Sequence, residues 1–245
     1  MLSKNQIKYI NSLQQKKFRQ EHQSFIVEGA KSVLELIQSD FEVESLFVTD
    51  DFYKENESLL EKQPLRAEIV SQAELERVGS FSSNNAALAT VKTKENQELF
   101  AQANEYVLIL DDIRDPGNLG TIVRVADWYG ITKIVCSKET VDFYGPKVIS
   151  STMGSFTRVA IYYTDLVSYL SNNSLKVYGT FLNSANVHTT QFAEAGYIII
   201  GNEANGISTE VERLVTDKIT IPRFGGAESL NAGIATAVIC DNLRR

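Results

Sequence analysis

Three short polar segments of the chain carry the side chains that could do chemistry. The first contains Asn118 and Arg124, the second contains Glu203, and the third contains Ser229 and Asn231. Each segment follows an apolar stretch typical of a β-strand, and ligands of open α/β sheets bind at the carboxyl ends of the strands. Amide, carboxylate, hydroxyl and guanidinium groups gathered there can bind a polar ligand. We therefore expect the three segments to build one active site.

The first segment leaves an apolar strand at residues 106–110, passes a Pro-Gly turn and enters a helix. We expect the helix to begin near Asn118, which would then be its N-cap, an ordinary role for asparagine. Arg124 lies six residues further on, where helical geometry turns it about 120° away from Asn118. Val123 and Val125 flank Arg124, so we expect its guanidinium to be partly buried and paired.

The second and third segments are rich in glycine. Residues 198–200 form an apolar strand that ends abruptly in Gly201, Asn202 and Glu203. An ordinary strand-to-helix loop would explain the glycines but not a glutamate directly after a buried strand. In the third segment, Glu228 or Ser229 is the expected cap of a last helix over residues 228–243. A glycine inside that helix, Gly233, costs about 1 kcal/mol relative to alanine, which indicates close packing or a ligand.

Other cofactor motifs are missing. The stretch 117–120 is not a dinucleotide fingerprint, and the chain contains neither a phosphate-binding loop nor a nucleophile elbow. His22 and His188 show no metal-ligand spacing, and we expect no metal site. Cys136 and Cys240 lie in apolar surroundings and are predicted to be buried free thiols.

The elements that must position these segments alternate between strand and helix, which predicts an α/β fold with a mostly parallel sheet covered on both faces. In the second half we expect strands at residues 106–110, 133–136, 158–162, 176–181, 197–200 and 218–221. We expect helices up to Tyr129, over 147–152 and 166–170, after an N-cap at Ser208, and over 228–243. In the first half, strands are expected at residues 24–28, 43–48, 67–70 and 86–91. Helices are expected there over 4–20, 29–39 and 53–61, and from a capping box formed by Ser71 and Glu74. The polar stretch before residue 105 predicts domains at 1–95 and 105–245 joined by a linker, 96–104.

Charge is unevenly distributed along the chain. The net charge is −7, which taken alone argues against nucleic-acid binding. Residues 1–20 nevertheless contain five basic residues and no acidic one: Lys4, Lys8, Lys16, Lys17 and Arg19. Such a segment can be a phosphate-binding surface or simply a solvated helix face. The N-terminus lacks the apolar core of a signal peptide, and no apolar run reaches the roughly 20 residues that span a bilayer. We therefore expect a cytoplasmic protein with no membrane partner.

The three polar segments together resemble the motifs of a known family. Asn118-x-Gly120-x-x-x-Arg124, the block Gly201-Asn202-Glu203, and Ile221-Pro222 followed by Glu228-Ser229-Leu230-Asn231-Ala232 are similar to the three motifs of the SpoU/TrmH RNA 2′-O-ribose methyltransferases, in the SPOUT superfamily. The resemblance covers residues 106–245. The first domain, with its sequence Phe25-Ile26-Val27-Glu28-Gly29, resembles more loosely the small RNA-binding domain that many members carry.

The resemblance implies a C-terminal SPOUT-type domain with a deep trefoil knot, a smaller N-terminal α/β RNA-binding domain, and a homodimer formed through the catalytic domain. It also implies S-adenosylmethionine as cofactor. The implied cofactor-binding residues are Thr180, Phe181, Leu182, Gly201, Asn202, Glu203, Ile221, Leu230 and Asn231. The implied catalytic residues are Asn118, Arg124, Glu203, Ser229 and Asn231.

The implied chemistry suits these residue types. A ribose 2′-hydroxyl is a poor nucleophile unless its proton is removed or its developing charge is stabilised. An arginine pKa above 12 disfavours Arg124 as the base, so we expect it to stabilise the forming alkoxide and a nearby phosphate. Asn118 and Glu203 would hold Arg124 in place, while Ser229 and Asn231 would position the nucleotide. The expected substrate is rRNA or tRNA, held by the basic segment and the catalytic cleft. The alternative is an RNA-binding protein on the same scaffold that has lost catalysis.

Overall fold

The chain folds into two compact units in a computed structural model that describes residues 1–81 and 83–245. The first unit comprises Met1–Glu95 and Asp142–Thr157, and the second comprises Asn96–Val141 and Arg158–Arg245. The chain therefore passes from one unit to the other three times. Within the described ranges, no helix is both long enough and apolar enough to cross a membrane.

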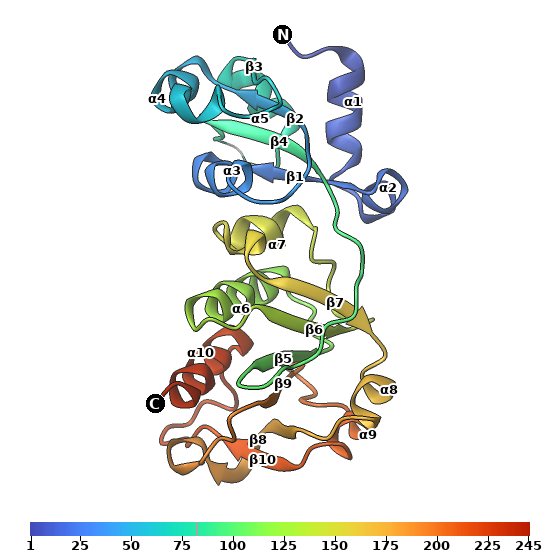
Figure 1. Ribbon diagram of the computed structural model, residues 1–245, viewed down its shortest axis with the longest axis vertical. Helices are drawn as coiled ribbons and strands as arrows, with labels where there is room; N and C mark the ends of the chain where they lie inside the picture. Colours follow the sequence, from blue (N-terminus) through green and yellow to red (C-terminus); the bar gives the residue numbers. More distant parts are fainter. Residues whose placement is uncertain (82) are drawn as a thin grey trace. The chain divides into compact units, whose positions relative to one another are not determined.

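The first unit is built on a four-stranded sheet with the strand order β1-β4-β2-β3 (Figure 1). Strands β1 and β2 both pair with β4 in antiparallel fashion, and β3 joins β2 in parallel. Its strands are β1 (Ser24–Glu28), β2 (Val43–Val48), β3 (Glu68–Ile69) and β4 (Ala87–Lys92). Its helices are α1 (Lys4–Ser12), α2 (Lys16–His22), α3 (Ala30–Ile37), α4 (Asp50–Leu60), α5 (Gln72–Val78), α7 (Pro146–Ser151) and the 3₁₀ helix η1 (Ser155–Thr157).

The single helix predicted over residues 4–20 is wrong, because the chain breaks between α1 and α2. The Ser12 hydroxyl donates back to the Tyr9 carbonyl at 2.6 Å, a bond that competes with helix continuation. The side chain of Leu13 is fully buried just after this point. The break leaves the Leu13 and Gln14 carbonyls without helical partners, and Arg19 Nη1 donates to them at 2.9 and 3.0 Å.

The segment Asp142–Thr157, although it follows β6 in the second half of the sequence, packs within the first unit. Its rings join an aromatic cluster, with the Phe25 and Tyr144 centroids 4.6 Å apart and the Phe41 and Phe156 centroids 5.7 Å apart. Arg19 Nη2 and Asp142 Oδ2 form an ion pair at 2.6 Å. Apolar packing and a partly buried charge pair together hold this segment in place.

The second unit contains a six-stranded sheet with the order β10-β8-β9-β5-β6-β7, in which every neighbouring pair is parallel. The predicted α/β fold with a parallel sheet is confirmed. The strands are β5 (Tyr106–Asp111), β6 (Lys133–Ser137), β7 (Ala160–Thr164), β8 (Lys176–Asn186), β9 (Gly196–Gly201) and β10 (Asp217–Thr220). The helices are α6 (Pro116–Trp128), α8 (Leu166–Ser171), α9 (Thr209–Glu212), α10 (Ala232–Leu243) and the 3₁₀ helix η2 (Val187–Thr189).

Helices cover both faces of this sheet. Alternate strand residues such as Val107 and Ile109 pack in one cluster with Leu166 of α8 and Val211 of α9. Helices α6 and α10 pack against each other, and α10 also contacts β9. Figure 1 shows α6 and α10 on one side of the sheet and α8 and α9 on the other. This double cover explains why the strands are apolar throughout rather than alternating.

Two predicted helix starts are corrected by the structure. The N-cap of α6 is Asp115, whose Oδ1 accepts from the Asn118 backbone N–H at 2.9 Å, so Asn118 lies inside the first turn. The N-cap of α10 is Asn231, and neither Glu228 nor Ser229 caps that helix. In both cases several polar residues in a row could act as caps, and tertiary contacts decide among them.

Residues 96–104 belong to the second unit and lie along its surface as a strap. The Asn96 side chain pairs with both backbone groups of Tyr163 on the edge strand β7, at 2.9 and 2.8 Å. Leu99 packs against the apolar cluster below, and the Tyr169 hydroxyl donates to its carbonyl. These contacts tie the strap to the sheet edge.

Candidate active site

Hydrogen bonds between side chains join the three motif segments. The Asn118 Nδ2–H donates to Glu203 Oε1 at 2.5 Å, and the Asn231 Nδ2–H donates to Asn118 Oδ1 at 2.6 Å. Asn118 comes from α6, Glu203 from the loop after β9, and Asn231 from the start of α10. The structure thus brings one residue of each segment into a single network, which we call the motif network.

Asn231 has a second task at the start of α10. Its Oδ1 accepts from the backbone N–H groups of Gly233 and Ile234 at 3.0 and 3.3 Å, while its amide N–H reaches Asn118. Gly233 allows α10 to approach α6, because a Cβ there would lie 2.6 Å from Thr121 Cγ2. The packing reason expected for this glycine is therefore present.

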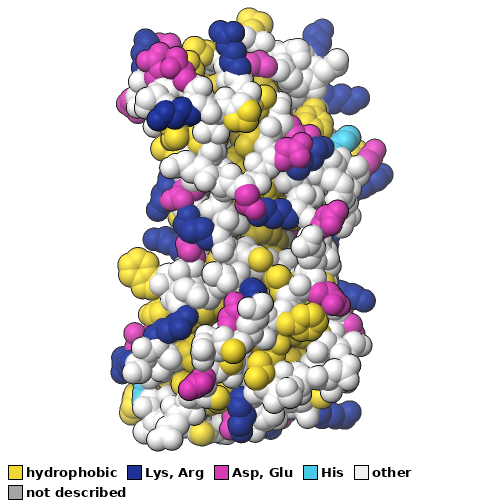
Figure 2. All heavy atoms as spheres, in the orientation of Figure 1, with side chains coloured by type: hydrophobic (Ala, Val, Ile, Leu, Met, Phe, Trp, Pro, Cys, Tyr) yellow, Lys and Arg dark blue, Asp and Glu magenta, His cyan; other side chains and the backbone are white. Residues whose placement is uncertain are grey.

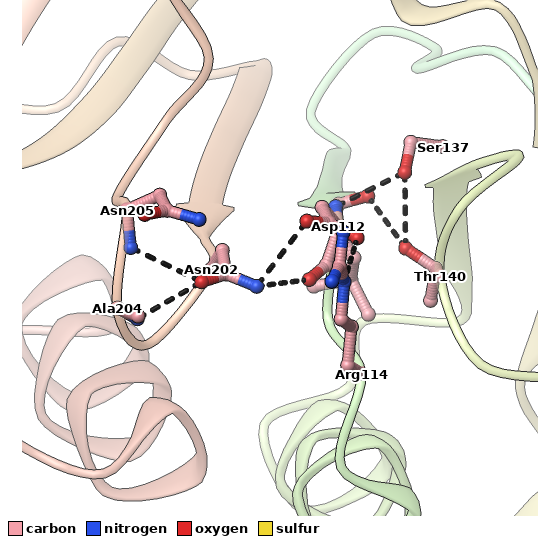
Figure 3. Close-up of polar contacts among 8 residues, drawn as sticks. Asp112, Arg114, Ser137, Thr140, Asn202, Ala204 and Asn205 are labelled. Carbon is pink, nitrogen blue, oxygen red and sulfur yellow. Dashed lines mark hydrogen bonds and ion pairs between the residues drawn. The ribbon is translucent and has the colours of Figure 1, made fainter.

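A second network fixes the loop after β9 (Figure 3). The Asn202 Nδ2–H donates to the Asp112 carbonyl at 2.8 Å, and Asn202 Oδ1 accepts from the Ala204 and Asn205 backbone N–H groups. Asp112 has a left-handed backbone, with φ 58°, and its N–H donates to Ser137 Oγ. The Asn202 side chain is thus occupied in shaping the loop.

Gly201 is required by the tight turn of the same loop. Asn202 and Gly206 exchange two backbone hydrogen bonds, at 3.0 and 2.8 Å. A Cβ on Gly201 would lie 2.3 Å from the Gly206 carbonyl carbon, and backbone atoms cannot yield at that distance. Sequence reasoning singled out these glycines, and the structure gives the steric cause.

The predicted cofactor residues Thr180, Phe181 and Leu182 lie in an interruption of β8. Lys218 of β10 pairs with Gly179, but the next residue, Ile219, pairs with Ala185. Residues 180–184 therefore bulge out of the ladder, and the Leu182 carbonyl accepts from the Thr220 hydroxyl at 3.0 Å. An irregular backbone of this kind, beside Ile221 and the exposed Leu230, suits a cofactor that is held largely through backbone groups.

Arg124 and Ser229 stand apart from the motif network. Arg124 is exposed on α6, whereas partial burial was expected, and in the described part of the chain no hydrogen bond or ion pair from its guanidinium is found. Ser229 is exposed in the loop before α10. Within one chain, Asn118 and Glu203 bind each other instead of holding Arg124. Sequence reasoning missed Asp112 and Asp115, although two aspartates after a buried strand and one before Pro-Gly were visible signals.

A separate pocket lies at the carboxyl ends of β5, β6 and β7. It is lined by Asp111, Ser137 and Thr164 and by the starts of α8 and α9. Asp111 Oδ2 accepts from the Ser208 backbone N–H and hydroxyl at 2.7 and 2.8 Å. Ser208 is the N-cap of α9, as predicted, but its hydroxyl serves this contact rather than the helix.

Comparison with known proteins identifies the family of the chain. Residues 105–241 match the SpoU rRNA Methylase family, and residues 4–89 match the MRM3-like substrate binding domain. The chain is 30% identical over 256 residues to the 23S rRNA (guanosine(2553)-2′-O)-methyltransferase RlmP of Bacillus subtilis, covering 99% of this chain and 97% of that protein. A TrmH-family structure from Porphyromonas gingivalis has a TM-score of 0.88 at 31% identity and covers 100% and 98% of the two chains. An AdoMet-bound rRNA methyltransferase from Sinorhizobium meliloti has a TM-score of 0.88 at 25% identity, covering 100% and 95%.

The fold and these relationships define the class of protein as an S-adenosylmethionine-dependent RNA 2′-O-ribose methyltransferase, which confirms the predicted activity and cofactor. The chain belongs to the SpoU rRNA methylase family. The comparisons offer no support for a scaffold that has lost catalysis.

Proposed function

We propose that this enzyme methylates a ribose 2′-hydroxyl of ribosomal RNA at the motif network. The observation that carries the proposal is the hydrogen-bonded connection from Asn231 through Asn118 to Glu203. The similarity to RlmP over nearly the whole of both chains supports rRNA as the substrate. Mapping 2′-O-methyl positions in rRNA and tRNA from cells with and without this protein tests it. A lost position in tRNA alone would contradict it.

Within this site, S-adenosylmethionine supplies a methyl group already activated as a sulfonium. Residues 180–182, 201–203, 221 and 230–231 hold it. Arg124 stabilises the negative charge that develops on the ribose oxygen while the hydroxyl proton passes to solvent water, because a guanidinium is a fixed positive charge. The motif network orients the loops that carry Ser229 and Asn231, and these two residues position the nucleotide.

Replacing Arg124 tests this division of roles. We expect Arg124→Ala to lower methyl transfer by about 10²- to 10³-fold, the effect of losing one charge-stabilising donor. Binding of S-adenosylmethionine, measured by calorimetry, should stay near wild type. Arg245→Ala is the control, since that exposed arginine pairs only with Asp241 in the final turn among the described contacts. An Arg124→Ala enzyme with full activity would contradict the proposed role of Arg124.

The lysines of α1 and α2 are the proposed RNA contact of the first unit. Lys4, Lys8, Lys16 and Lys17 are exposed, whereas Arg19 is buried and serves structure. Basic and acidic side chains are intermixed over the face drawn in Figure 2, which shows no extended basic surface. The proposed lysine contact is therefore a local one. Truncating residues 1–20 would also remove the buried Ile10 and Leu13. Neutralising Lys8, Lys16 and Lys17 to glutamine is the sharper test, and it should flatten the salt dependence of RNA binding.

We also propose that the catalytic domain forms a homodimer through α6 and α10. Trp128 on α6 is 83% exposed and Ile234 on α10 is 53% exposed, although both helices are packed against each other. A second copy would cover these apolar side chains. Ile234→Glu should shift sedimentation velocity from dimer to monomer, and a wild-type monomer would contradict the proposal.

We also propose that the second unit is knotted and, because the proposed substrate is rRNA, that the enzyme is cytoplasmic. Strand β10 lies at the sheet edge beyond β8, yet the chain returns to pack α10 against α6. The close approach of α10 to α6 at Gly233 is of the kind that a threaded segment needs. A crystal structure that traces residues 201–245 tests the knot, and fractionation of cells for the protein tests the location.

A further inference from the structure

One aromatic side chain near the active site is almost entirely in solvent. Phe224 is 96% exposed, in a stretch from Arg223 to Asn231 in which every residue is exposed. Burying a phenylalanine side chain is worth about 1.5–3 kcal/mol, so leaving this one in water forgoes a substantial gain. Phe181, a phenylalanine of the predicted cofactor loops, is by contrast partly buried against the apolar core.

The loop that carries Phe224 is closed by a hydrogen bond and connects predicted cofactor-binding residues to predicted catalytic residues. Arg223 Nη1 donates to the Ala227 carbonyl at 3.3 Å, which closes the loop. A Cβ added to Gly225 or Gly226, at the tip of the loop, would meet no atom within 4 Å, so the space around the tip is open. The two ends of the loop are Ile221, of the cofactor set, and the Ser229–Asn231 stretch, of the catalytic set.

We propose that Phe224 is a stacking platform for a base at or beside the methylated nucleotide, and that Arg223 contacts the neighbouring phosphate. The proposal rests on the proposed function of the same site. RNA recognition in single-stranded regions works by stacking unpaired bases on aromatic side chains. A ribose held near Ser229 and Asn231 carries its base within reach of the loop that begins at Ile221.

A second copy of the chain is the competing occupant of this ring. The neighbours of Phe224 favour RNA, because the adjoining side chains are a cation and two glycines rather than an apolar patch. Arg223 keeps guanidinium N–H groups in solvent after bonding Ala227, since one of its five donors is used in that contact. A cation beside a bare ring suits a phosphate followed by a base.

Substitutions that separate stacking from apolar bulk test the proposal. Phe224→Leu keeps an apolar side chain but removes the flat ring, and Phe224→Trp keeps the ring. Phe100→Leu is the matched control, since Phe100 is a half-exposed phenylalanine on the strap. The measurements are RNA affinity by filter binding, KM and kcat for RNA, S-adenosylmethionine affinity and sedimentation velocity.

We expect Phe224→Leu to weaken RNA binding and raise KM by about 5- to 150-fold, the equivalent of one lost base stack. Phe224→Trp and Phe100→Leu should behave like wild type, and cofactor affinity and oligomeric state should not change. Wild-type RNA affinity in Phe224→Leu overturns the proposal, as does a loss of self-association in that variant. If the wild-type enzyme left rRNA unmethylated, the proposed function would fail by itself, whereas the filter-binding comparison would still decide whether Phe224 stacks on RNA.

Discussion

Asn118 shows why an amide, and no other side chain, suits the centre of the motif network. Its Nδ2–H donates to Glu203 and its Oδ1 accepts from Asn231, so both ends of the amide are used. An aspartate offers acceptors only and would face Glu203 with a second negative charge. A hydroxyl is too short to reach two loops. The residue type follows from having a carboxylate on one side and an amide donor on the other.

Gly201 provides a prediction at the same scale. Gly201→Ala should destabilise the protein by about 1–3 kcal/mol, the usual range for overpacking, because its Cβ meets backbone 2.3 Å away. We also expect loss of S-adenosylmethionine binding, measured by calorimetry beside urea unfolding. Gly225→Ala is the matched control, since open space surrounds that position. Cofactor binding of wild-type strength in Gly201→Ala would remove this loop from the cofactor site.

The two thiols should be inert in the folded protein. Burial raises the pKa of the Cys240 thiol to about 12 and raises that of Cys136 as well. The thiolate is the reactive form, and a pKa near 12 leaves only about 10⁻⁴ of it at pH 8. A thiol reagent at pH 8 should therefore label native protein very slowly and label both cysteines in guanidinium chloride. Rapid labelling of the native protein would contradict the buried positions.

At the scale of elements, the start of α10 combines helix capping with site assembly. Asn231 Oδ1 caps the helix while its Nδ2–H reaches α6, so one residue ties the last helix to the first motif. Likewise Asp115 caps α6 and thereby places Asn118 in its first turn. The capping residues at these two helix ends therefore also help to assemble the site.

Asn231 variants can separate these two tasks. Asn231→Asp keeps an oxygen acceptor for the cap, so we expect stability near wild type in thermal unfolding. It loses the donor to Asn118, and methyl transfer should fall by roughly 100-fold through misplacement of the site. Asn231→Ala loses both and should also cost about 1 kcal/mol of stability. Equal activity in the aspartate variant and the wild type would show that the Asn118 contact is dispensable.

At the scale of the whole molecule, Arg19 shows that one residue of the basic segment 1–20 has a structural role. Its side chain is 7% exposed, pairs with Asp142 and satisfies two carbonyls at the break between α1 and α2. Residues 142–157 thereby complete a unit whose other residues all precede position 96. Folding of the first unit consequently depends on a segment that is synthesised much later.

Breaking this pair should be costly. Arg19→Met leaves Asp142 and two carbonyls without their donor, and we expect a loss of about 3 kcal/mol, typical of removing one partner of a buried pair. Urea unfolding followed by circular dichroism measures it. Lys54→Met breaks the exposed pair with Asp50 and should leave the midpoint unchanged. If both variants unfold at the same urea concentration, Arg19 has no structural role.

Most elements and the family could be predicted from the amino-acid sequence. The capping box of Ser71 and Glu74 and the strand at Val43–Val48 were predicted correctly because capping residues and apolar runs act over a few residues. The motif set was recognisable for a related reason, since residue types follow the chemistry they perform. The predicted roles of the individual site residues stay predictions.

Which of several polar residues meet depends on the tertiary structure. Asn118 and Asn231 are 113 positions apart, and Arg19 and Asp142 are 123 apart. No periodicity covers such distances, so Asn231 rather than Ser229 as the cap, and Arg19 as a buried partner, were beyond reach. The physical reason is that a polar side chain has several local options of similar free energy, and packing of distant segments selects one.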